Sequence, residues 1–116
     1  MLPATVMTEN RYRVRFIVHQ RDRHYLVKVD DIDWIESAGN YARLHTTKGA
    51  FLLRTTLKDL ERSLDPGKFG RVHRGAIVNL DRVAEIRHES FGDYSILLSS
   101  GQRLRLSRHY KRNIMR

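Results

Sequence analysis

The segment from Arg103 to the C-terminus concentrates the side chains best suited to binding phosphates and nucleobases, with six Lys or Arg and no Asp or Glu. It begins as a strict alternation, Arg103-Leu104-Arg105-Leu106, that continues into Ser107-Arg108. Because successive side chains of a β-strand point to opposite faces, the pattern predicts a strand that buries its leucines and exposes its arginines. A one-sided cationic surface on a β framework most often meets a polyanion, so nucleic acid is the first partner we expect.

The basic excess of the whole chain has the same character. The formal net charge is +9, and seventeen of the 22 basic residues are Arg. The guanidinium group is a planar, permanently charged fork that fits phosphate and the paired acceptors of guanine, whereas Lys binds mainly by charge. The composition therefore favours a protein that recognises phosphates and bases by their geometry as well as by charge.

Composition also bounds the domain organisation and the compartment. The 116 residues, 41% of them hydrophobic, predict a single domain over residues 11–116, preceded by a tail or linker over residues 1–10. The absence of cysteine excludes disulfides, thiolate zinc sites and Cys nucleophiles, and it favours a reducing cytoplasm. The longest apolar runs have three or four residues and residues 1–10 lack a signal-peptide pattern, so we expect no membrane partner.

Patterns of catalytic and metal-binding residues are missing. The six histidines show no His-x-x-x-His or His-x-His spacing, and Ser107 and His109 lie outside any Gly-x-Ser-x-Gly turn. We expect no catalytic residue, no metal and no cofactor. A small hydrolytic enzyme and an RNA-binding β domain are the alternatives; the RNA module is disfavoured because its paired, exposed aromatic side chains are not evident.

Hydrophobic periodicity predicts a mainly β domain of short hairpins with one or two small helices. A period of two, with intervening turn residues, predicts strands at residues 12–19, 25–29, 41–47, 51–54, 69–73, 76–80, 83–88 and 94–98. Ser37 to Asn40 is expected to form a loop. One helix should begin at Thr55 or Thr56, bury Leu57, Leu60 and Leu64, and end at Pro66; a further helical turn is expected near residues 109–115.

Four segments in register carry a resemblance to a known family. They are Asp31-Ile32-Asp33-Trp34-Ile35-Glu36-Ser37-Ala38-Gly39-Asn40-Tyr41, then Leu53-Arg54-Thr55-Thr56-Leu57 with Leu60-Glu61, then Phe69-Gly70-Arg71-Val72-His73-Arg74-Gly75-Ala76-Ile77-Val78-Asn79-Leu80, and finally Ser100-Gly101 with Leu106-Ser107-Arg108-His109-Tyr110. Together they resemble the LytTR DNA-binding domain of the LytR/AlgR response regulators. The resemblance implies an elongated β fold that inserts loops into successive major grooves of double-stranded DNA. It also implies a bacterial two-component transcription regulator, with a receiver domain absent from this chain and a homodimer on paired half-sites.

The resemblance also implies three DNA-facing loops. The first carries Asn40, Tyr41 and Arg43, the second His73 and Arg74, and the third Ser107 and Arg108. Gly75 departs from the Ser more usual in the family, and Ala42 offers no polar group at a position that some relatives use. Arg can donate twice to guanine and Asn suits adenine. Five further cations suit phosphate contacts: Lys48, Arg54, Arg103, Arg105 and Lys111.

Several of these residues also have a purely structural interpretation. His73 lies next to an apolar residue and could serve the fold, while Arg108 could cap a helix or pair with an acid. Trp34 and Tyr41 could stack on bases, although Trp34 lies between Ile32 and Ile35 and is better explained as core. Asn79 follows an apolar run and is expected to close a turn.

Overall fold

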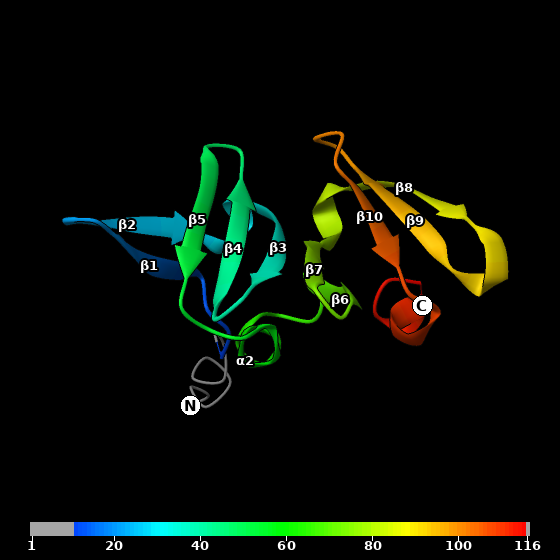
Figure 1. Ribbon diagram of the computed structural model, residues 1–116, viewed down its shortest axis with the longest axis horizontal. Coiled ribbons are helices and arrows are strands. Elements are labelled where there is room, and N and C mark those ends of the chain that lie inside the picture. The colour runs from blue at the N-terminus through cyan, green and yellow to red at the C-terminus, as the bar shows by residue number, and fades with distance from the viewer. Residues whose placement is uncertain (1–10, 116) are drawn as a thin grey trace, which may run out of the picture.

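The fold is known from a computed structural model that describes residues 11–115 (Figure 1). The expected tail at residues 1–10 lies outside these described residues. Ten strands form three antiparallel sheets of two, five and three strands. The domain measures 49 × 44 × 24 Å, so it is extended in two directions and thin in the third.

The two-stranded sheet pairs β1 (Arg15–Gln20) with β2 (Arg23–Lys28). The five-stranded sheet has the order β5-β4-β3-β7-β6, and the three-stranded sheet has the order β10-β9-β8. Their bounds are β3 (Ile32–Ala38), β4 (Tyr41–Thr46), β5 (Gly49–Leu53), β6 (Phe69–His73), β7 (Ala76–Asn79), β8 (Val83–His88), β9 (Tyr94–Leu98) and β10 (Arg103–Leu106). One α-helix, α2 (Leu57–Ser63), and four 3-10 segments, η1 (Val29–Asp31), η2 (Leu80–Arg82), η3 (Ser90–Gly92) and η4 (Arg108–Asn113), complete the described chain.

The mainly β prediction is confirmed, but the sequence predicted no strand at β3, in the centre of the sheet. Ser37 and Ala38 were expected in a loop, yet they end β3, and the turn begins at Gly39. Alternation fails as a signal here because β3 pairs with β4 on one side and β7 on the other and is buried from Ile32 through Ile35. At the other end of the chain, β1 begins at Arg15 and leaves the expected strand residue Val14 54% exposed.

Helix α2 begins as the sequence predicts and ends at Ser63, shortly before the expected stop at Pro66. The Thr56 hydroxyl accepts a hydrogen bond from the backbone N–H of Asp59 at 3.1 Å, which satisfies one of the free amides of the first turn. Leu57, Leu60 and Leu64 are all buried. Because a helix of seven residues is too short to be stable alone, burial of this leucine stripe against the sheet holds it in place.

The two faces of the five-stranded sheet pack into separate cores. Ile35 and Ile77 belong to the core beneath α2 and the β1–β2 hairpin, whereas Trp34 and Val78 belong to the core shared with the three-stranded sheet. Neighbouring residues of β3 and β7 thus anchor opposite cores, as the period of a strand requires. The centre of the sheet is therefore fixed from both sides.

Two buried polar residues, Asp33 and Asn79, link β3 to the end of β7 and the segment that follows it. Asp33 is 8% exposed, and its Oδ1 lies 3.1 Å from Nε of Arg82. Asn79 is 4% exposed; its Nδ2 donates to the carbonyl of Ile32 at 2.8 Å, and its Oδ1 accepts from the N–H of Asp81 at 3.0 Å. The structural role expected for Asn79 is confirmed.

Replacing Asn79 by Ala should lower the free energy of unfolding by about 1–3 kcal/mol, because the carbonyl of Ile32 and the N–H of Asp81 both lose their partner. Asn40→Ala is the matched control, since Asn40 is exposed in a turn, and it should change stability by less than about 0.5 kcal/mol. Urea denaturation of both variants measures the difference. Equal stability of the two variants would remove Asn79 from its structural role.

Candidate nucleic-acid interface

Three strands, β3, β6 and β10, end at the same edge of the domain. Both β3 and β6 pair antiparallel with β7, so they run in the same direction and finish on the same side. The backbone N–H of Ser37 donates to the carbonyl of Gly75 at 2.9 Å, and the N–H of Ser107 donates to the carbonyl of Val72 at 2.9 Å. These two bonds join the turns at Gly39–Asn40, Arg74–Gly75 and Ser107–Arg108, which we call the three-turn edge. In Figure 1 the arrows of β3 and β10 both run toward the lower side of the view.

The first turn presents Asn40 and Tyr41 to solvent. Gly39 has φ +65°, a left-handed conformation that glycine adopts without strain, and it reverses the chain between β3 and β4. The Asn40 side chain is exposed, and within residues 11–115 it has no polar partner; Tyr41 is 39% exposed. Arg54 follows the end of β5, where Leu53 pairs with Ala42, so its exposed guanidinium belongs to the same side of the sheet.

Arg43 has a less free position than the sequence suggests. Its Nη1 lies 3.2 Å from Oε1 of Glu36, the residue opposite it on β3, and that same oxygen is 2.9 Å from Nε2 of His45. The hydrogen bond from His45, assisted by that from Arg43, lowers the pKa of the Glu36 carboxyl, although burial opposes the effect. The Arg43 guanidinium is therefore held against the sheet by a carboxylate that offsets part of its charge.

Trp34 packs against His45, which contacts Glu36, and belongs to the core. Its ring is 9% exposed and stacks on His45 with a centroid distance of 4.2 Å and an interplanar angle of 5°. A base could not reach either face of the indole without displacing packed side chains. The interpretation of Trp34 as a core residue is confirmed.

The second turn uses one nitrogen of His73 and leaves the other free. The N–H of Gly75 donates to Nδ1 of His73 at 2.9 Å, so the ring helps to close the turn. Burial, followed by the charges of Arg105 and Arg71, lowers the pKa of His73 and favours the neutral ring. A neutral ring that accepts at Nδ1 carries its proton on Nε2, where it can donate to a base or a phosphate. The neighbouring Arg74 side chain is exposed.

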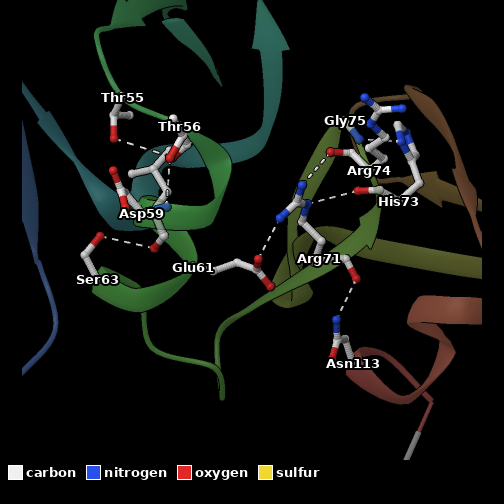
Figure 2. A network of polar contacts seen from close by, with 11 residues as sticks. Thr55, Thr56, Asp59, Glu61, Ser63, Arg71, His73, Arg74, Gly75 and Asn113 are labelled. Atoms are coloured by element: carbon white, nitrogen blue, oxygen red, sulfur yellow. Dashed lines mark hydrogen bonds and ion pairs between the residues drawn. The ribbon is translucent and has the colours of Figure 1, made fainter. Parts of the chain in front are cut away.

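Arg71, which the sequence did not single out, clamps this turn (Figure 2). Its guanidinium donates to the carbonyls of His73 at 3.1 Å and Arg74 at 2.5 Å and pairs with Glu61 of α2 at 2.6 Å. Its own carbonyl accepts from Nδ2 of Asn113 in η4 at 2.9 Å. Arg71 therefore fixes the second turn relative to both helical segments. Nothing in its sequence context distinguishes it from the exposed arginines.

The third turn projects Arg108 from the start of η4. The Ser107 hydroxyl accepts from the N–H of His109 at 3.2 Å, and the N–H of Arg108 donates to Oδ1 of Asp93 at 3.3 Å. The side chain of Arg108 is exposed and passes beside Gly92, where an added Cβ would lie 3.5 Å from Cδ of Arg108. Arg108 thus takes part in capping through its backbone alone, and its guanidinium faces solvent.

Four of the cations assigned to phosphate contacts lie either on β10 and η4 or in the β4–β5 turn. Arg103 and Arg105 stand on the exposed face of β10, with Nε of Arg105 3.6 Å from Oδ2 of Asp93; Lys111 lies 5.6 Å from the ring centroid of Tyr94. Lys48 lies in the β4–β5 turn, and the six residues of β4 separate it from the first turn by about 20 Å at the rise of a strand. The structure does not bring Lys48 to the three-turn edge.

Phe91 is a second residue that the sequence did not single out. It lies in η3 between β8 and β9, is 92% exposed and has φ +62°. An aromatic residue before Gly92 in the short connection between two alternating strands is the one available sequence signal.

Among residues 11–115, no helix has both the length and the apolar character that a membrane span requires.

Comparison with known proteins gives a consistent family. The profile described as "LytTr DNA-binding domain" matches residues 22–116. The transcriptional regulatory protein BtsR of Escherichia coli K12 is 32% identical over 114 residues, covering 96% of this chain and 46% of that protein. The sensory transduction protein LytT of Bacillus anthracis is 27% identical over 89 residues, covering 77% of this chain and 36% of that protein.

The fold has a solved counterpart. A LytTr DNA-binding domain of a methyl-accepting/DNA response regulator from Bacillus cereus superposes with a TM-score of 0.79, covering 86% of this chain and 92% of that chain at 18% identity. The matched part of the chain therefore shares its fold with that domain. It spans less than half of the length of BtsR and LytT.

The His73 interaction predicts a pH-dependent stability. Because the pKa of His73 is lowered in the fold, the unfolded chain binds the proton more readily between the folded pKa and about 6.5. The contribution of the neutral ring should be complete above about pH 6.5 and should be lost as the pH falls through the folded pKa. His73→Asn, whose side-chain oxygen can accept the same bond without titrating, should lack this loss. Urea denaturation from pH 8 to pH 5 measures it, and an NMR-titrated pKa above 6.5 for His73 would contradict it.

The Arg71 clamp predicts that charge alone cannot replace the guanidinium. Arg71→Lys should lower the free energy of unfolding by about 1–3 kcal/mol, since a single ammonium cannot reach Glu61 and two carbonyls together. Arg62→Lys, at an exposed position of α2, is the control and should stay within about 0.5 kcal/mol of the parent. Equal denaturation midpoints for the two variants would mean that the contacts of the Arg71 guanidinium do not contribute to the free energy of unfolding.

Proposed function

This chain belongs to the LytTr DNA-binding domain family, and we propose that it recognises a specific sequence of double-stranded DNA through the three-turn edge. The observation that carries the proposal is the pair of backbone hydrogen bonds, from Ser37 to Gly75 and from Ser107 to Val72, that join three turns with exposed polar tips. Turns whose main chain is already fixed can be matched to the grooves of a duplex at a lower ordering cost on binding.

The tips carry side chains that can discriminate bases. Arg108 and Arg74 are exposed and can each donate twice to O6 and N7 of guanine, while the amide of Asn40 can pair with N6 and N7 of adenine. Nε2–H of His73 adds one donor beside Arg74. The longest dimension of the domain is 49 Å and exceeds the roughly 34 Å repeat of the double helix, so the domain is long enough to reach successive major grooves.

Phosphate contacts surround these tips. Arg54 flanks the first turn, Arg105 and Lys111 flank the third, and Arg103 stands farther away at the start of β10; all four side chains are exposed. Tyr41 and Ser107 add hydroxyl groups at the same edge. Such contacts fix register and affinity without reading sequence. We assign Arg43 a weaker share because Glu36 offsets part of its charge, and we leave Lys48 outside the contact surface because it lies at the far end of β4.

The relatives indicate the larger setting. BtsR is named a transcriptional regulatory protein and LytT a sensory transduction protein, and this chain matches a part of each. We propose that the chain is the DNA-reading part of a bacterial transcription regulator working in the cytoplasm. In this proposal a receiver domain supplies the signal, two copies bind paired half-sites, and no catalytic step takes place. An RNA-binding role is disfavoured because the exposed tips carry hydrogen-bond donors and lack a paired aromatic platform.

The assigned roles predict different losses for Arg108 and Lys111. Arg108→Ala should weaken binding to a selected target duplex by roughly 5- to 150-fold, because a bidentate contact to guanine is worth about 1–3 kcal/mol, and it should change binding to a scrambled duplex much less. Lys111→Ala should weaken both duplexes alike and reduce the slope of log affinity against log salt by about 0.9. Fluorescence anisotropy at several salt concentrations measures both effects.

Lys48→Ala is the matched control. It removes one positive charge, as Lys111→Ala does, but from the end of β4 that lies away from the three-turn edge. It should leave both affinities and the salt slope unchanged. If Lys48→Ala weakened binding as much as Lys111→Ala, the duplex would have to lie elsewhere on the domain. If the parent protein bound target and scrambled duplexes equally, sequence recognition itself would be excluded.

A further inference from the structure

The connection between β8 and β9 carries an aromatic ring that the fold does not use. Phe91 is 92% exposed, and its φ of +62° lies in the left-handed region that side chains other than glycine seldom adopt. Both properties oppose folding, since the ring gains no burial and the backbone gains strain. The residue therefore has no stabilising role in the described domain.

This connection is nevertheless well ordered by hydrogen bonds. The N–H of Glu89 donates to the carbonyl of Asp93 at 2.9 Å, and the N–H of Asp93 donates to the carbonyl of Ser90 at 3.3 Å. The Ser95 hydroxyl donates to Oε2 of Glu89 at 2.9 Å. These bonds close a short turn with Phe91 at its apex, so the ring is held outward and does not fold back on the sheet.

The apex lies directly beside the third turn of the three-turn edge. Leu106, the last residue of β10, pairs with Tyr94, the first residue of β9, so the β8–β9 connection and Arg108 leave the sheet at the same end. The N–H of Arg108 donates to Asp93, and a Cβ added at Gly92 would lie 3.5 Å from Cδ of Arg108. In Figure 1 the β8–β9 connection lies at the right of the view, with β9 between it and β10.

We propose that Phe91 is a specificity residue that contacts the C5-methyl group of a thymine next to the base read by Arg108. This inference rests on the proposed function. The thymine methyl is the one apolar group that the standard base pairs expose in the major groove, and aromatic side chains are among its partners. An arginine and a phenylalanine side by side would thus read a guanine and an adjacent thymine together.

The surroundings of the ring favour DNA over a protein partner. The neighbours Ser90 and Gly92 add no apolar surface, so Phe91 is a single point of contact and does not form the contiguous patch expected of a docking surface. Arg105, Arg108 and Lys111 make the vicinity cationic. Two acids lie close to the ring: Glu89, whose Oε2 accepts from the Ser95 hydroxyl, and Asp93, which is bound by Arg105 and by the N–H of Arg108.

Replacement of thymine by uracil tests the proposal, because it removes only the methyl group. Each thymine of a duplex selected from a random pool is replaced in turn, and affinities are measured for the parent protein and for Phe91→Ala. At one thymine beside the Arg108-dependent guanine, the replacement should weaken the parent by about fourfold, the value of one buried methyl group. Phe91→Ala should bind both duplexes equally.

The outcomes separate this inference from the proposed function. If the parent prefers the selected duplex but every uracil replacement has the same effect on Phe91→Ala as on the parent, the methyl contact is excluded while sequence recognition stands. If the parent does not prefer the selected duplex over a scrambled one, the proposed function fails first, and the methyl contact with it.

Two further variants control for trivial effects. Leu26→Ala removes another exposed apolar side chain, 69% exposed on β2, and should retain the full uracil effect. Phe91→Gly should be at least as stable as the parent, because glycine adopts positive φ freely, and yet should lose the uracil effect. Retention of the uracil effect by Phe91→Gly would overturn the proposal.

Discussion

Two backbone hydrogen bonds determine whether this domain has a binding surface at all. The bond from Ser37 to Gly75 attaches the β3–β4 turn to the β6–β7 turn, and the bond from Ser107 to Val72 attaches the end of β10 to the same hairpin. The β6–β7 hairpin therefore connects segments from the two halves of the chain. Since main-chain atoms make both bonds, the relative positions of the tips do not depend on which side chains the tips carry. The fold can thus keep its geometry while the tip residues change the sequence that is read.

The rigidity of that hairpin follows from its place between two cores. Ile77 packs beneath α2 and the β1–β2 hairpin, whereas Val72, Ala76 and Val78 pack against the three-stranded sheet. Loops on such a scaffold can carry function without disturbing it. The acids near the edge have a complementary role: Glu36 holds Arg43 against the sheet, and Asp93 orients both Arg105 and the backbone of Arg108. A strongly basic domain thereby keeps some cations fixed and leaves others free for DNA.

The sequence predicts local features well and the shared edge poorly. Period-two alternation placed β8 and β9, and the Thr56 cap with its leucine stripe placed α2. Strand β3 was not predicted, because burial on both faces removes the alternation of polar and apolar residues. Pairing between distant segments cannot be read from composition or spacing. Lys48, only eight residues from Asn40, lies at the opposite end of β4, whereas the turns that carry Arg74 and Arg108 are joined through β6. The resemblance to the family supplied the three loops as a set, but neither the Arg71 clamp nor the outward ring of Phe91 has a distinctive local pattern.

The central claim is that three turns act as one rigid surface on DNA. Backbone amide NMR of the labelled domain, titrated with a selected duplex, tests this claim directly because each turn has its own reporter. The amides of Asn40, Gly75 and Arg108 should all shift and should saturate together at one affinity, while Gly49 at the far end of β4 stays unchanged. Largest shifts at Gly49, or separate affinities for the three turns, would contradict the account.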